Sequence, residues 1–267
     1  MARHIVFAIA LAAAVGLASP VRPDVWDSAT VNDNGNGTTN EITHGFSQVH
    51  DLGAQPGPVA DEDWYRIVQQ PFSSYEVLCD GFTGDVNTGF PNTLHLVTGA
   101  GAEVLPSFPY AFGYARSLRF TNDSPTSNVN DFVRVQNAAC GTSCGTNDNY
   151  RIRAWDTTIA VPRYNNTAGQ VTVLIIQNPA QDTAVGFAYL WTITGGTTPV
   201  TSYGFILLPR QAVVLNLATI NGGAANGTSG TITIAHNGRY GQLAVKSVAL
   251  EPATGFSFDT PGLYKPN

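Results

Sequence analysis

The stretch that decides the fold is DEDWYRIV, residues 61–68. After three acidic residues, Tyr65 and Ile67 alternate with Arg66 and Val68, so apolar side chains return at every second position. A two-residue period is typical of a β-strand with one buried face. Three adjacent carboxylates stand out in a chain that is only 12% charged, and they indicate a catalytic cluster, a metal site or a solvated strand start.

The same alternation recurs along the chain, and no segment with a helical period competes with it. The alternating segments of the first half are residues 92–99, 116–122, 131–137 and 149–156. Those of the second half are residues 171–178, 184–193, 201–209, 212–220, 230–238 and 241–251. Short strands divided by Gly, Pro and Asn predict an all-β fold.

A polar stretch, DTTIAVPRYNNTAGQ at residues 156–170, separates the two series of strands. We therefore predict two tandem β-sandwich domains, residues 40–156 and residues 157–267. The second series has regularly spaced turn signals, which are typical of an immunoglobulin-like sandwich.

The first 20 residues, MARHIVFAIALAAAVGLASP, have the pattern of a secretory signal peptide. Arg3 precedes an apolar run from Ile5 to Leu17 that is too short to span a bilayer, and Ala18 is placed for cleavage. This pattern predicts a signal peptide at residues 1–18, followed by a polar lead-in at 19–39. We expect a secreted bacterial protein, extracellular or periplasmic, with no membrane span.

The charge of the chain argues against one class of ligand, and the positions of the cysteines predict their chemical state. The formal net charge is −6 and there is no Lys/Arg run, which argues against nucleic-acid binding. Cys140 and Cys144 lie close together in a Gly-rich segment, and we expect them to form a disulfide in an oxidising compartment. Cys79 shares its strand face with Tyr75 and Val77, which predicts a buried thiol that packs as a small hydrophobe.

The order of features in residues 40–156 resembles the bacterial pre-peptidase C-terminal (PPC) domain, over a little under half of the chain. The matching pieces are NEITHG (40–45), DEDWYRIV (61–68), SYEVLCDGFTGD (74–85), TLHLVTGAGAEV (93–104), SLRF (117–120) and the final hairpin from DFVRV to NYRIRAWD (131–156). The resemblance implies a jelly-roll or sandwich domain that is not catalytic and that serves secretion, stability or substrate binding.

Collagen-binding relatives in that family hold Ca²⁺ between the N-terminal lead-in and the first strongly alternating strand. The resemblance therefore implies a calcium site with Glu41, Asp61 and Asp63 as ligands, since Ca²⁺ prefers carboxylate, amide and carbonyl oxygens. Asp61 and Asp63 alternate, so both can point to the same side of the strand. The alternative is a solvated acidic strand start with Arg66 as its partner.

An aromatic alternation lies in SFPYAFGYARS, residues 107–117. On a strand these rings would line one face and form a stacking platform for sugar rings or extended polymers. Pro109 and Gly113 favour the alternative of a loop packed over the sandwich. The four rings of this ligand-binding hypothesis are Phe108, Tyr110, Phe112 and Tyr114.

These observations favour a secreted, non-catalytic binding or adhesion module for a polysaccharide, an extracellular protein or another envelope component. The first alternative is a structural subunit or accessory protein of an exported assembly, with contacts through strand edges. A weaker alternative is a hydrolase with a dispersed site, in which His50 and Asp51 would act as a base and its orienting acid. H-E-x-x-H does not occur in the chain.

Overall fold

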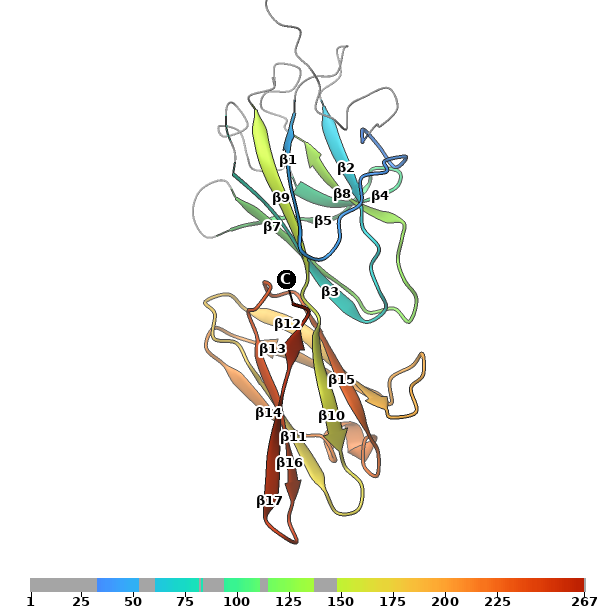
Figure 1. Ribbon diagram of the computed structural model, residues 1–267, viewed down its shortest axis with the longest axis vertical. Helices are drawn as coiled ribbons and strands as arrows, with labels where there is room; N and C mark the ends of the chain where they lie inside the picture. The colour runs from blue at the N-terminus through green and yellow to red at the C-terminus, as the bar shows by residue number, and fades with distance from the viewer. Residues whose placement is uncertain are drawn as a thin grey trace, which may run out of the picture.

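The computed structural model describes residues 33–52, 61–81, 83, 94–110, 115–136 and 148–266. Within these residues the chain forms four antiparallel sheets, arranged as sandwiches that follow one another along the long axis (Figure 1). The prediction of an all-β sandwich fold is confirmed. The described residues include no helix long and apolar enough to cross a membrane.

The N-terminal half contains a five-stranded sheet of order β1-β9-β3-β7-β6 and a four-stranded sheet of order β2-β8-β4-β5. Its strands are β1 (Phe46–Asp51), β2 (Glu62–Arg66), β3 (Ser73–Asp80), β4 (Leu94–Thr98), β5 (Glu103–Pro106), β6 (Phe108–Pro109), β7 (Arg116–Asn122), β8 (Asp131–Gln136) and β9 (Asn149–Asp156).

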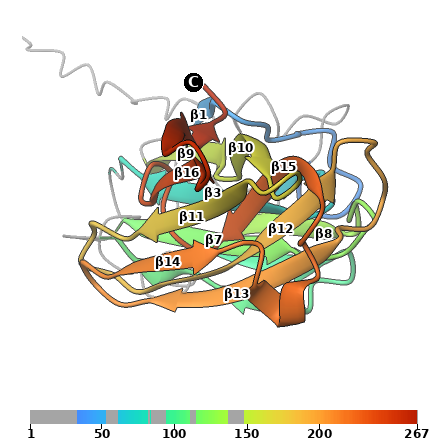
Figure 2. The same cartoon turned by 90° about the horizontal axis from the view of Figure 1, so that it is seen from below.

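The C-terminal half contains a five-stranded sheet of order β13-β12-β15-β10-β18 and a four-stranded sheet of order β14-β11-β16-β17, seen from below in Figure 2. Its strands are β10 (Ile159–Asn165), β11 (Val171–Gln177), β12 (Ala184–Thr192), β13 (Thr201–Leu207), β14 (Ala212–Asn216), β15 (Ser229–His236), β16 (Ala244–Glu251), β17 (Phe256–Pro261) and β18 (Leu263–Tyr264). A short 3-10 helix, Ile220–Gly223, follows β14.

Each half has its own hydrophobic core between its two sheets. The alternation of β2 has the expected effect, because Tyr65 and Ile67 enter the core of the N-terminal half. Trp64, on the opposite face of β2, is also buried, since it packs against Val97 and Phe132 in a smaller cluster. β2 is therefore covered on both faces at this point.

Cys79 is fully buried in the N-terminal core, as predicted. Burial raises the pKa of its thiol, so the group stays protonated and packs as a small hydrophobe. Cys140 and Cys144, the expected disulfide pair, lie outside the described residues.

The polar stretch at residues 156–170 contains an unpredicted strand, β10. β10 runs through it and buries Ile159, Val161 and Tyr164 in the C-terminal core. Only Thr157 and Thr158 separate β9 from β10. The Thr157 N–H donates to the Ser74 carbonyl over 2.8 Å, and the Ser74 N–H donates to the Thr158 hydroxyl over 2.9 Å, so this link is tied to β3.

Further contacts hold the two halves together. Phe72 of the N-terminal half packs between Tyr189 and Trp191 of β12, with ring centroids 4.8 and 5.1 Å away. The Tyr189 hydroxyl donates to the Asp123 carboxylate over 2.8 Å. The Tyr240 N–H donates to the buried Glu76 carboxylate over 2.8 Å. We call this contact region the junction.

His236 ends β15 and is fully buried close to the junction. Its Nδ1 accepts the Gly238 N–H over 3.0 Å, and its ring lies edge-on to that of Tyr264. Burial lowers the pKa of the His236 imidazole to about 4. The side chain is therefore neutral in the folded protein at neutral pH.

The burial of neutral His236 predicts that the folded protein becomes less stable as the pH falls. In the unfolded chain this imidazole takes up a proton near its ordinary pKa of about 6.5, whereas the folded protein resists protonation down to about pH 4. The free energy of unfolding should therefore fall by about 3 kcal/mol as the pH drops through this window. Urea unfolding between pH 7.5 and pH 4 measures the slope, and His236→Asn should remove this part of it. An unchanged slope in the variant would contradict the assignment.

Candidate functional site

Two of the three acids in DEDWYRIV (61–68), Asp61 and Asp63, are buried. Asp61 and Asp63 are 2% and 0% exposed, whereas Glu62 between them points outward, where its carboxylate lies 3.8 Å from Arg134. The two aspartates share the inward phase of the strand, as their spacing predicted. The alternative of a solvated acidic strand start is therefore wrong, since the fold encloses both carboxylates.

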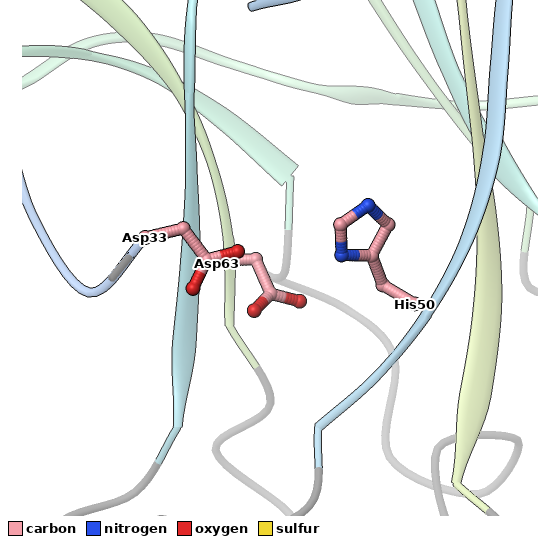
Figure 3. Close-up of side chains that lie close together, drawn as sticks. All are labelled: Asp33, His50 and Asp63. Carbon is pink, nitrogen blue, oxygen red and sulfur yellow. The ribbon is translucent and has the colours of Figure 1, made fainter. Parts of the chain in front are cut away.

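Asp63 forms a cluster with Asp33 and His50 (Figure 3). Asp33 lies in the lead-in, His50 on β1 and Asp63 on β2, and each offers one ligand atom within 4.8 Å of the others. The Trp64 N–H donates to the Asp33 carbonyl over 2.7 Å, which fixes the lead-in beside β2. We call these three buried side chains the acid–imidazole cluster.

Two buried tyrosines extend the acid–imidazole cluster. The Tyr150 hydroxyl donates to the Asp63 carboxylate, and the Tyr65 hydroxyl lies 2.5 Å from that of Tyr150. The His50 ring stacks on Tyr150 at 5.8 Å and meets Tyr65 edge-on at 5.2 Å. Burial and the Asp63 charge raise the pKa of both tyrosines, so both stay protonated and act as donors.

The structure brings only one of the three expected calcium ligands into this cluster. Glu41 is exposed and forms an isolated parallel bridge with Arg66, and Asp61 is buried outside the group of three. The imidazole of His50 also changes the donor chemistry. Ca²⁺ is bound by oxygen ligands, whereas a mixed set of imidazole and carboxylates also suits Zn²⁺ or Mn²⁺.

His50 was also the base of the hydrolase hypothesis. Its ring faces Asp33 and Asp63, its Nε2 lies 2.8 Å from the Gln48 side-chain oxygen, and the residue is only 1% exposed. A substrate cannot reach this imidazole in the described structure, so the geometry lends the hydrolase hypothesis no support.

A second candidate site is a hollow of 470 Å³ at the junction. Phe108 and Arg119 line it from the N-terminal half, and Asp182 and Asn237 line it from the C-terminal half. The Phe108 ring is 45% exposed, and the Arg119 guanidinium lies 5.4 Å from its centroid. An aromatic ring thus lies beside guanidinium, carboxylate and amide groups.

A neighbouring hollow of 560 Å³ shares Arg119 and Asn237 with the first. Its polar lining includes Asp123, Asn128 and Asp131, and Asp131 accepts a hydrogen bond from the Asn128 amide over 2.6 Å. Because the two hollows share lining residues, we treat them as one extended site and call it the junction groove.

Of the four expected aromatic residues, the structure places Phe108 in the lining of the junction groove and Tyr110 outside that lining, against Arg239. The half-buried Tyr110 lies under the Arg239 guanidinium, 4.4 Å from the ring centroid. Arg239 in turn pairs with Asp182 over 2.7 Å. Phe112 and Tyr114 lie outside the described residues.

No protein-family model and no curated protein matches the chain. Among solved structures, the Thermotoga maritima protein 1070 is 14% identical at a TM-score of 0.34, with 41% of this chain and 94% of that chain covered. A Bacteroides uniformis β-glucuronidase is 13% identical at a TM-score of 0.18, with 82% and 32% covered. A second enzyme of that organism, β-glucuronidase 2 with a covalently bound cyclophellitol-6-carboxylate aziridine, is 15% identical at 0.18, with 76% and 26% covered. These likenesses are too weak to carry an argument, and the resemblance to the PPC domain stays a prediction.

The hydrogen bond from Tyr150 to Asp63 predicts that two matched Tyr→Phe substitutions lower the free energy of unfolding by different amounts. Tyr150→Phe removes a buried donor to the Asp63 carboxylate, whereas Tyr164→Phe removes a partly buried hydrogen bond to the neutral Thr228 hydroxyl. We expect Tyr150→Phe to lower the free energy of unfolding by about 2–3 kcal/mol and Tyr164→Phe by about 1 kcal/mol. Denaturant unfolding measures both, and equal losses would show that the Asp63 contact adds nothing.

Proposed function

We propose that the protein is an exported, non-catalytic binding module that holds an extended, uncharged polysaccharide in the junction groove. The observation that carries this proposal is the exposed Phe108 ring among hydrogen-bonding side chains from both halves of the chain. The apolar N-terminal segment of residues 1–18 supports export.

The chemistry of the junction groove suits a sugar polymer. A sugar ring offers an apolar face that packs on an aromatic ring, and its hydroxyls exchange hydrogen bonds with carboxylates, amides and guanidinium groups. Two adjoining hollows suit several consecutive sugar units. The charged lining residues are Arg119, Asp123, Asp131 and Asp182. One positive and three negative charges oppose binding of a polyanion, so we favour an uncharged polymer.

The junction contacts support a preformed groove. Phe72 packs on Tyr189, and the Tyr189 hydroxyl binds Asp123, which itself lines the groove. A groove whose walls are fixed before binding loses less conformational entropy when the ligand binds. Moderate affinity is then attainable with a single exposed aromatic ring.

Phe108 gives a direct test of the proposal. The mature protein should co-sediment saturably with at least one insoluble uncharged polysaccharide from a panel of cellulose, chitin, xylan and mannan. Phe108→Ala should weaken binding about tenfold, since loss of a stacked ring costs on the order of 1.4 kcal/mol. The matched control is Phe256→Ala, because Phe256 is 78% exposed on β17 and lies outside the groove.

Binding that survives Phe108→Ala, or that falls equally in both variants, would contradict the groove. Failure of the protein to bind any polymer of the panel would overturn the polysaccharide proposal. A large homo-oligomer in gel filtration, together with no polymer binding, would instead favour the structural-subunit alternative.

We also propose that the acid–imidazole cluster holds a divalent cation. The supporting observation is the convergence of three buried ligating side chains from the lead-in, β1 and β2. Bound there, a cation would offset the two carboxylate charges and would connect the lead-in to the two strands. Tyr150 would act as an outer partner, since its hydroxyl orients Asp63.

Metal removal tests the cation proposal. Elemental analysis of the purified protein should find about one equivalent of Zn²⁺, Mn²⁺ or Ca²⁺, and removal by a chelator should lower Tm by about 5–10 °C. Asp33→Asn should abolish both the bound metal and the chelator effect. Asp259→Asn is the matched control, because that exposed acid pairs with Lys246 on the protein surface. The proposal would be overturned if the purified protein contained no metal and its Tm did not change on addition of Zn²⁺, Mn²⁺ or Ca²⁺.

A further inference from the structure

A separate pocket of 280 Å³ lies where the C-terminal tail meets the N-terminal half. It shares no lining residue with the junction groove and includes no member of the acid–imidazole cluster. We call it the tail pocket. Its lining includes Glu41, Ile42, His44, Ile67, Asp156 and Lys265.

Backbone pairing of the segment 40–45 builds the wall of the tail pocket. The Ile42 N–H donates to the Arg66 carbonyl and the Gly45 N–H donates to the Ala154 carbonyl, each over 3.0 Å. The segment therefore bridges the end of β2 in one sheet and β9 in the other. The side chains of Ile42 and Ile67 are buried, so the floor of the pocket is apolar.

The C-terminal tail closes one side of the pocket through two hydrogen bonds. The Pro266 carbonyl lies 3.0 Å from His44 Nε2, and the Lys265 carbonyl accepts the Tyr240 hydroxyl over 2.6 Å. His44 Nδ1 accepts the Asp156 N–H over 3.0 Å, so the proton of the ring resides on Nε2. Both ring nitrogens are thus satisfied by the neutral imidazole.

The rim of the tail pocket carries a net negative charge. Glu41 and Asp156 contribute two carboxylates and Lys265 contributes one ammonium group, while His44 is neutral. The Thr158 N–H binds Oδ1 of Asp156 and leaves Oδ2 available for a ligand. Within the described part of the chain, the Glu41 carboxylate and the Lys265 ammonium group lie in no ion pair.

We propose that the tail pocket binds a small organic cation, a primary ammonium group on a short apolar body. The apolar floor accommodates the body, and the two rim carboxylates attract the ammonium group. The volume of 280 Å³ is at the lower end of ligand pockets, which limits the body to a few carbon atoms. The proposal is independent of the polysaccharide and of the metal.

Three probes of equal length test the charge preference. We would titrate the full mature chain with n-butylammonium, 1-butanol and butyrate, and follow the NMR signal of the Trp155 indole N–H, because Trp155 lines the pocket. Trp155→Phe assigns that signal. We expect saturable binding of butylammonium at millimolar concentration, with butanol at least about fivefold weaker and butyrate at least about tenfold weaker.

Charge variants locate the interaction. The double variant Glu41→Gln, Asp156→Asn should weaken butylammonium binding about tenfold and leave butanol binding unchanged. The matched control is Glu251→Gln on β16, which lies outside the pocket. Should the double variant fold poorly, Thr43→Phe at the exposed edge of the pocket obstructs it sterically and should abolish binding of both probes.

Equal binding of the three probes, no binding, or an undiminished affinity in the double variant would overturn the proposal. Nα-acetyl-lysine N-methylamide then identifies the source of the cation. Binding of this compound as well as butylammonium indicates a lysine side chain of a polypeptide, and binding of butylammonium alone indicates a free amine; the proposal stands in both cases.

Discussion

The buried carboxylate of Glu76 on β3 supports residues beside both the junction groove and the tail pocket. One oxygen accepts the Ser117 hydroxyl and the other accepts the Tyr240 N–H of the C-terminal half, each over 2.8 Å. Burial lowers the pKa of Arg119 and the Glu76 charge opposes that effect, so the carboxylate also helps to keep this guanidinium charged where it lines the junction groove.

Tyr240 extends the influence of Glu76 to the tail pocket. Its backbone N–H is held by Glu76, its ring stacks on Trp155 at 6.2 Å, and its hydroxyl binds the Lys265 carbonyl. A single buried acid therefore sets the position of a residue that contacts β9 and the C-terminal tail together. A buried charge with well-placed hydrogen bonds can specify geometry in this way even where its net contribution to stability is small.

The strands were predictable because their signal is local. A two-residue alternation records which side chains face the core, and it placed Tyr65, Ile67 and Cys79 correctly. It failed at β10, where polar neighbours and Pro162 obscured the apolar residues Ile159, Val161 and Tyr164. That strand lies between β15 and β18, and its partners are distant in the sequence.

The candidate sites were only partly predictable, because their residues converge from distant segments. Asp63 was identified because it lies among three adjacent acids. Nothing in the sequence near Asp33, apart from the polar character of the lead-in, marked it as a ligand. His50 was noted for its neighbour Asp51, whereas its ring lies near Asp33 and Asp63. The pairing of Phe108 with Arg119, and of both with Asp182, follows from strand order and from the packing of the two halves. A single sequence does not contain that information.

The hydrogen bond between His44 and the Pro266 carbonyl holds the C-terminal end of the chain against the N-terminal half. The chain leaves the C-terminal half by turning back, so its last described residues lie at the waist of the structure and not at its far tip (Figure 1). Anything joined to that end, such as an affinity tag, would therefore begin at the waist. It would begin close to the tail pocket, which Lys265 lines, whereas the exposed Phe256 lies on β17 and does not line that pocket.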